Sequence, residues 1–170
     1  MFFITGLPRS RTKWFADYFS GVHETICWHE AMNGCHSVND FLWKMTRLPF
    51  KHIGNSDSGL MYTNFQQWFM GAPTVVIERD PEAVLRSLEK KYGEHEGMKD
   101  VLTDQLRRLE NVQGLRIPFN EIDERIQEIH EYLVSVPFDD EYAQEMINQN
   151  RQVGNVMVDL ASYKMWMGGS

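Results

Sequence analysis

The chain has 170 residues, 42% of them hydrophobic and 12% aromatic, and its formal net charge is −7. This length fits one folded domain with a hydrophobic core, and the composition excludes an intrinsically disordered chain. The negative net charge argues against binding to nucleic acid or to an anionic membrane surface. We therefore expect one domain over residues 1–170.

Three features predict a cytoplasmic protein. No apolar run reaches the roughly 20 residues that a membrane-spanning helix needs. A predicted strand begins at Met1, which leaves no room for a signal peptide. Cys27 and Cys35 are the only cysteines, too few for a disulfide framework.

With His29 and His36 these cysteines form the spacing C-x-H-x5-C-H, which matches no standard zinc pattern, so no metal is expected.

The first twenty residues predict a strand, a tight loop and a helix. Residues 1–5 are an uninterrupted apolar run, typical of a strand buried on both faces of a parallel sheet. Residues 6–12 form a turn, and aromatic residues then recur at helical spacing up to Gly21. Such a loop presents free backbone N–H groups to an anion, and here it carries Arg9, Arg11 and Lys13. The stretch therefore predicts a phosphate or sulfate site.

The loop does not follow the Walker A pattern of nucleoside triphosphatases. That pattern, G-x-x-x-x-G-K-[ST] placed on Gly6, requires glycine, lysine and a hydroxyl residue where the chain has Arg11, Thr12 and Lys13. The loop instead resembles the 5′-phosphosulfate loop of sulfotransferases that use 3′-phosphoadenosine 5′-phosphosulfate (PAPS), whose pattern is P-[KR]-S-G-T-T. The segment Pro8-Arg9-Ser10-Arg11-Thr12-Lys13 matches four of the six positions and departs at Arg11 and Lys13.

A second motif supports the same resemblance. Residues 74–77 predict another buried strand, which leads into Arg79-Asp80-Pro81 and, eight residues after the arginine, Ser87. The 3′-phosphate motif of these sulfotransferases reads R-[DN]-P-x-x-V/A with a serine at that distance. Arg79 can bind a phosphate through two parallel hydrogen bonds, and Asp80 can cap a helix with Pro81 in its first turn. Because both motifs occur in order after buried strands, the chain resembles the sulfotransferase superfamily over most of its length.

The resemblance implies roles for individual residues. Arg9 takes the position that contacts the transferring sulfuryl group, and the backbone amides of residues 10–12 hold the 5′-phosphate. Arg79 and Ser87 hold the 3′-phosphate. The implied cofactor-binding set is Pro8, Arg9, Ser10, Arg11, Thr12, Lys13, Arg79 and Ser87.

A catalytic base is expected where the second predicted strand, residues 24–29, ends. A sulfuryl acceptor loses a proton as its oxygen or nitrogen attacks, so a base must lie within hydrogen-bond reach. The resemblance makes Glu30 the first choice and His29 the second, since a His-Glu pair follows the second strand in similar members. The alternative is that Glu30 forms a cap or an ion pair and His29 packs in the interior.

The remaining chain alternates between helix and strand patterns. Helices are expected over 37–45, 60–70, 98–111, from a cap at Asn120 onward, and over 139–150; strands are expected over 51–55 and 114–119. The polar turn 55–59 is expected at the same sheet edge as the motifs. The aromatic segment 60–70 is core, and part of it can wall an adenine pocket. Residues 89–97 are expected to form a mobile loop, and residues 153–167 an edge strand or a tail.

These elements predict an α/β, P-loop NTPase-like fold with a mainly parallel sheet of four to five strands flanked by helices. The predicted function is PAPS-dependent sulfuryl transfer to an unidentified hydroxyl or amine acceptor, a small molecule or a saccharide, without a metal. Two alternatives stay open: a P-loop nucleotide kinase or phosphotransferase, and a nucleotide-binding module without turnover. The short length resembles small sulfotransferase-like proteins of bacteria and their phages.

Overall fold

A computed structural model gives the fold and describes residues 1–149, so the predicted edge strand or tail over 153–167 lies outside the described residues. Its centre is a sheet of five strands in the order β2-β3-β1-β4-β5, and every neighbouring pair is parallel. The strands are β1 (Phe2–Gly6), β2 (Thr25–His29), β3 (His52–Ser56), β4 (Thr74–Glu78) and β5 (Leu115–Pro118). The predicted α/β fold with a parallel sheet is confirmed.

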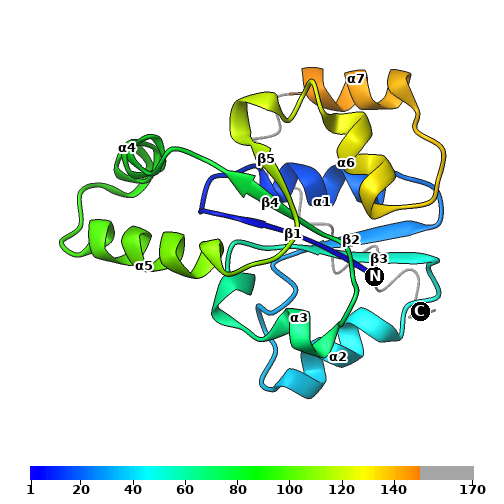
Figure 1. The fold of residues 1–170 in the computed structure, drawn as a ribbon, viewed down its shortest axis with the longest axis horizontal. Coiled ribbons are helices and arrows are strands. Elements are labelled where there is room, and N and C mark those ends of the chain that lie inside the picture. The colour runs from blue at the N-terminus through cyan, green and yellow to red at the C-terminus, as the bar shows by residue number, and fades with distance from the viewer. Residues whose placement is uncertain (150–170) are drawn as a thin grey trace, which may run out of the picture.

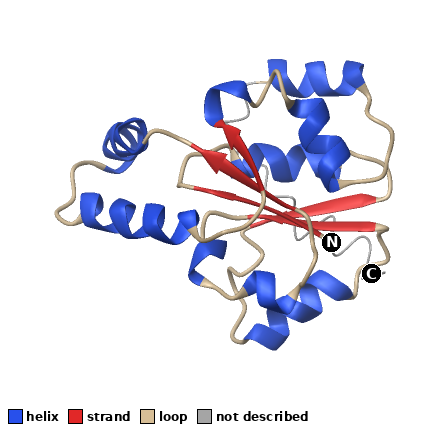
Figure 2. Ribbon diagram, in the orientation of Figure 1, coloured by secondary structure: helices blue, strands red, loops and turns tan. Residues whose placement is uncertain are grey.

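Helices cover both faces of the sheet (Figures 1 and 2). One layer contains α1 (Thr12–Ser20), α6 (Ile126–Leu133) and α7 (Asp140–Asn148). The other contains α2 (Val38–Thr46), α3 (Phe65–Trp68) and α5 (Met98–Glu110), and α4 (Pro81–Tyr92) lies beyond the end of β4. Two short 3₁₀ helices, η1 (Leu60–Tyr62) and η2 (Phe119–Glu121), complete the described elements.

The core is divided by the central strand β1. Successive side chains of a strand point to opposite faces, so an apolar run can supply both layers. Phe2 and Ile4 pack with α1, α6 and α7, whereas Phe3 packs with the aromatic residues of α2 and α3. All five residues of β1 are buried. The prediction of a strand covered on both faces is therefore confirmed.

Three helices begin at a polar side chain that caps them, and the cap at Asp80 was predicted from the sequence. The Ser37 hydroxyl accepts the N–H of Asp40 at 3.2 Å, and the Asp80 carboxylate accepts the N–H groups of Glu82 and Ala83. Asp139 accepts the N–H of Tyr142 and begins α7. Short polar side chains satisfy the first N–H groups of a helix, which explains why these boundaries can be read locally.

The predicted helix over residues 60–70 is wrong. The segment instead forms η1 and α3, separated by an extended Thr63 whose hydroxyl accepts the N–H of Phe65. Phe65 and Phe69 are buried while Met70 is 87% exposed. Core contacts of the aromatic rings, not helical periodicity, therefore determine the path of this segment.

Two other predicted boundaries are also wrong. The helix α4 continues through residues 89–92, and Gly93, with φ +85°, ends it, so the loop comprises residues 93–97 only. Asn120 lies within η2 and does not cap a helix; α6 begins at Ile126 after Arg125. Ile122 and Ile126 are both buried, and the turns between them achieve this burial without a continuous helix.

Candidate active site

The two sequence motifs lie at adjacent positions because β1 and β4 are neighbours. Their parallel register pairs Gly6 with Ile77, so both strands end at the same edge of the sheet. A side chain at position 6 is excluded, since a Cβ there would lie 2.7 Å from the carbonyl oxygen of Ile77. The loop after β1 thus begins in direct contact with the end of β4. We call this loop (residues 7–11), together with Arg79 and Ser87, the cradle.

The cradle loop has backbone geometry suited to an anion. Arg9 and Arg11 both have left-handed backbone angles, with φ 67° and 60°, and Ser10 between them is fully buried. No side chain of the described residues caps the first turn of α1. Its first N–H groups therefore remain available, and the positive end of the helix dipole adds to their attraction for an anion.

The cradle also contains an unsatisfied buried hydroxyl. Ser10 Oγ has no hydrogen-bond partner among residues 1–149. A buried polar atom without a partner costs free energy, which a bound phosphate or sulfate oxygen would recover. The loop thus fits an anion in both backbone and side-chain chemistry.

Side chains of the two motifs contact each other directly. Arg9 Nε donates to Ser87 Oγ at 3.2 Å, and Arg79 Nη1 donates to the backbone carbonyl oxygen of Arg9. The helix α4 begins at Pro81, and Ser87 lies about two helical turns later, on the side that faces the loop. The structure therefore brings together residues that are seventy or more positions apart in the sequence.

The residue that follows β5, Phe119, packs against the cradle. The β4–β5 register pairs Glu78 with Pro118, so Phe119 lies beside Arg79, whose guanidinium is 4.1 Å from the ring centroid. Burial lowers the pKa of Arg79, and the charges of Arg9 and Arg11 lower it further. The nearby Asp80 opposes this shift but has the smallest influence of the four. Arg79 therefore lies in a positive environment.

Arg11 and Lys13 have a different environment from Arg9 and Arg79. Arg11 forms a bidentate ion pair with Asp123, in the turn between η2 and α6. Lys13 Nζ donates to Asp17 Oδ2 at 3.0 Å, one helical turn further along α1. Sequence reasoning missed Phe119 and Asp123. Their signal was their place at and just after the end of the predicted strand 114–119, because the sites of parallel sheets lie at such ends.

The predicted bases lie at the same sheet edge: His29 is the last residue of β2, and Glu30 follows it. His29 Nε2 is 3.4 Å from Thr12 Oγ1 and 3.8 Å from Glu30 Oε1. Glu30 has φ 54°, and its Oε2 accepts from Asn33 Nδ2 at 2.7 Å. Burial lowers the pKa of His29, and the neighbouring carboxylates, Glu30 first among them, oppose that shift. His29 thus contacts both Thr12, the first residue of α1, and Glu30.

A second carboxyl group, that of Asp57, lies beside Glu30 in the polar turn after β3. The register pairs His29 with Ser56, and the N–H of Glu30 donates to the Ser56 carbonyl oxygen, which places the turn beside Glu30. Asp57 is 5% exposed, and Gly59 donates to its Oδ1 at 2.6 Å. Burial raises the pKa of Asp57. The turn therefore lies at the same edge of the sheet as the two sequence motifs, as expected for a parallel strand.

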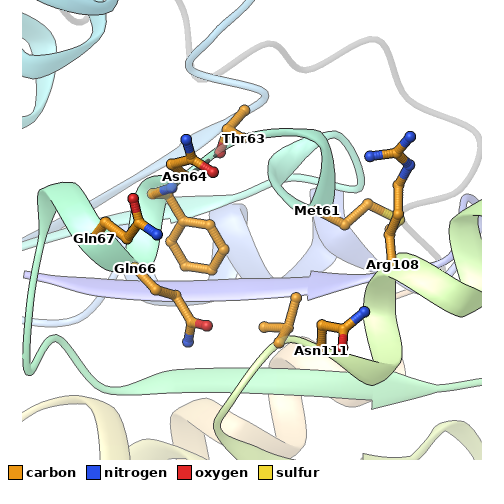
Figure 3. A pocket seen from close by; sticks show the side chains of 9 residues that line it. Met61, Thr63, Asn64, Gln66, Gln67, Arg108 and Asn111 are labelled. Carbon is orange, nitrogen blue, oxygen red and sulfur yellow. Dashed lines mark hydrogen bonds between the residues drawn. The ribbon is translucent and has the colours of Figure 1, made fainter.

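A separate pocket of about 340 Å³ lies between η1–α3 and the end of α5 (Figure 3). Two of its polar side chains have partners within the protein: Gln66 forms hydrogen bonds with the backbone of Gln113 through both amide atoms, and Arg108 pairs with Asp104. The pocket shares no lining residue with the cradle. The expectation that residues 60–70 wall an adenine site stays a prediction.

Within residues 1–149, no group of three or more His, Cys, Asp or Glu side chains is arranged to hold a metal ion. No helix in this part of the chain is long and apolar enough to cross a membrane. Cys27 and Cys35 are free thiols.

A parallel sheet in this strand order, with a tight loop between β1 and α1, defines a P-loop NTPase-like α/β fold. Among solved structures the chain is similar to mouse sulfotransferase SULT7A1, determined in complex with PAP, with a TM-score of 0.62 and 13% identity. The match covers 85% of this chain and 61% of the mouse chain, so this chain spans about three fifths of that protein's length. The chain therefore has the sulfotransferase fold. No family model and no curated protein matches its sequence.

Proposed function

We propose that the protein is a PAPS-dependent sulfotransferase that transfers a sulfuryl group to a hydroxyl or amine of a small molecule or saccharide. The observation that carries this proposal is the pair of contacts from Arg9 to Ser87 and from Arg79 to the Arg9 carbonyl oxygen. These contacts join the two motifs into one cationic site that can hold both phosphates of the donor. The sulfotransferase fold supports the proposal.

The donor would occupy the cradle. The free N–H groups at the start of α1 and the Ser10 hydroxyl would hold the 5′-phosphate. Arg79 and Ser87 would hold the 3′-phosphate, and Pro8 would shape the entrance of the loop. Arg9, at the centre, would contact the sulfuryl group and stabilise the charge that develops on the leaving phosphate oxygen.

The acceptor would lie on the side of His29 and Glu30. Its oxygen or nitrogen attacks the sulfur, the bond from sulfur to the phosphate oxygen breaks, and the acceptor's proton moves to the Glu30 carboxylate. The products are the sulfated acceptor and 3′-phosphoadenosine 5′-phosphate (PAP). His29 is the second candidate base; because burial lowers its pKa, it is neutral and able to accept a proton at pH 7.

A nucleotide-binding module without turnover is the second candidate function. The observation that favours it is the short hydrogen bond from Asn33 to Glu30, which engages one carboxylate oxygen of the proposed base. The two candidates differ in the effect of Glu30→Gln, which would abolish transfer in an enzyme while leaving nucleotide binding intact. For either candidate we propose a cytoplasmic protein, because both cysteines are free thiols.

The test is calorimetric titration with PAP in the absence of metal, and separately with ATP and magnesium. We expect PAP to bind and Arg79→Ala to weaken it by at least about tenfold, because a charge-assisted hydrogen bond to phosphate is lost. Arg86→Ala is the matched control, since Arg86 lies on the exposed side of α4 with its side chain 68% exposed. Binding of ATP with magnesium but not of PAP would contradict the proposal and favour a kinase.

A further inference from the structure

The cations of the cradle and of the first turn of α1 fall into two groups by their hydrogen-bond acceptors. Arg9 donates to a hydroxyl and Arg79 to a backbone carbonyl, both of which are neutral acceptors. Arg11 and Lys13 donate instead to carboxylates. The first group occupies positions that match the two motifs, and the second occupies the two positions where the loop departs from them.

Arg11 is held by three contacts, with two aromatic rings and one carboxylate. Its guanidinium lies 5.5 Å from the ring centroid of Trp14 and 5.8 Å from that of Phe119. Asp123 binds both terminal nitrogens, and the Arg11 side chain is 25% exposed. A guanidinium that contacts two rings and a carboxylate has few donors left for a ligand.

Lys13 has a comparable internal partner. Asp17 is the acceptor, and its side chain is only 4% exposed. A carboxylate removed from water needs a cation or several hydrogen-bond donors beside it. The Lys13 ammonium meets that need from within the same helix, so its charge is compensated before any ligand arrives.

Arg9 and Arg79 lack such compensation within the described part of the chain. Neither donates to a carboxylate there, and the two guanidiniums are close enough to repel each other. A bound anion would compensate their charges. The positive charges around the loop are therefore not equivalent.

We propose that Arg11 and Lys13 are positioning residues whose side chains are held by Asp123 and Asp17, while Arg9 and Arg79 are the cations whose side chains bind the nucleotide. The Arg11–Asp123 pair joins the cradle loop to the turn after β5 and so positions Phe119 beneath Arg79. This inference rests on the proposed function for the identity of the nucleotide. It changes the role that the sequence resemblance implied for the side chains of Arg11 and Lys13.

The experiment measures PAP affinity by calorimetry for Arg11→Gly, Lys13→Thr, Asp123→Asn and the double variant of Arg11→Gly with Asp123→Asn. Glycine at position 11 keeps the backbone N–H and accepts the left-handed angle. Asp100→Asn, on the exposed side of α5, is the control for loss of one negative charge. Titrations at several salt concentrations separate a charge effect from a loss of packing.

We expect Arg11→Gly and Lys13→Thr each to weaken PAP binding by less than about fivefold, the range of a partly exposed ion pair. Asp123→Asn exposes an uncompensated guanidinium, so PAP binding becomes tighter and more salt-dependent. The tighter binding and the stronger salt dependence expected for Asp123→Asn should both be absent from the double variant and from Asp100→Asn. A loss of tenfold or more in Arg11→Gly, as in Arg79→Ala, would overturn the proposal by making Arg11 a phosphate ligand. Persistence of the tighter binding in the double variant would also overturn it.

A measurement without nucleotide separates this inference from the proposed function. The same Arg11 and Asp123 variants form a double-mutant cycle for urea unfolding. We expect the pair to be coupled by at least about twofold in the unfolding equilibrium constant. If wild type fails to bind PAP but the coupling is present, the sulfotransferase proposal fails while the ion pair stands. Absence of coupling would overturn the inference even if PAP binds.

Discussion

At the carboxyl edge of the sheet, the half built on β1 and β4 is cationic, whereas the half built on β2 and β3 carries carboxylates and a histidine. The cationic half contains Arg9 and Arg79, whose acceptors in the structure are neutral. The acidic half contains Glu30, Asp57 and His29. Repulsion among cations favours a bound anion on one side, while the other side offers groups that can accept a proton.

Under the proposed function, this difference in charge corresponds to a difference in role. A donor with two phosphates needs fixed positive charge, and an acceptor that loses a proton needs a base. The two halves meet at Thr12, whose hydroxyl lies 3.4 Å from His29 Nε2. Thr12, the first residue of α1, thus lies at the boundary between the proposed donor site and the proposed acceptor site, and variants in each half should have separable effects.

The largest expected effect is on turnover, from Glu30→Gln in the acidic half. Loss of a general base should lower kcat by about 10²–10⁴-fold, while PAP affinity stays near that of wild type. Glu24→Gln is the matched control, because Glu24 precedes the same strand at its opposite end. An acceptor screen with labelled PAPS, followed by kinetics on the best acceptor, provides the measurement. Unchanged turnover in Glu30→Gln would shift the role of base to His29.

The next effect concerns the cationic half, where Gly6→Ala should displace the cradle. A Cβ at this position would lie 2.7 Å from the backbone oxygen of Ile77, so either β4 or the loop has to move. We expect a loss of about 1–3 kcal/mol in the free energy of unfolding, measured with urea, and weaker PAP binding. Wild-type stability together with wild-type PAP affinity would show that the loop does not depend on this close approach.

The smallest expected effect is a change in the titration of His29, which reports on the boundary between the halves. Burial lowers its pKa, and the negative charge of Glu30 opposes the shift, so Glu30→Gln should lower the pKa further. NMR titration of the imidazole would measure this. A rise in the pKa on loss of Glu30 would contradict the geometry.

The same shift has a consequence for stability. The unfolded chain binds a proton to this histidine near pH 6.5, whereas the folded chain does so only at lower pH. The contribution of His29 to stability is therefore complete above about pH 6.5 and is lost as the pH falls toward the lower folded value. Urea unfolding of wild type and His29→Gln at pH 7.5 and pH 5.5 would detect a smaller loss at acidic pH in the variant.

Local patterns predicted the strands and most helix boundaries because the responsible forces act within a few residues. The apolar run of β1 and the caps at Ser37, Asp80 and Asp139 are examples. The segment 60–70 was misread because its aromatic spacing suits a helix, whereas burial of Phe65 and Phe69 requires a break at Thr63. Periodicity describes one element at a time and cannot anticipate packing against the others.

By itself, the sequence determined the α/β class, the parallel sheet and the two motifs, since strand–loop–helix patterns and motif spacing are local properties of the chain. Only the tertiary structure decided which charges compensate one another. Asp123 is more than a hundred positions from Arg11, and Phe119 reaches Arg79 only because β5 pairs with β4. Ion pairs and ring contacts between distant segments depend on strand order and register, and these emerge only when the whole sheet assembles.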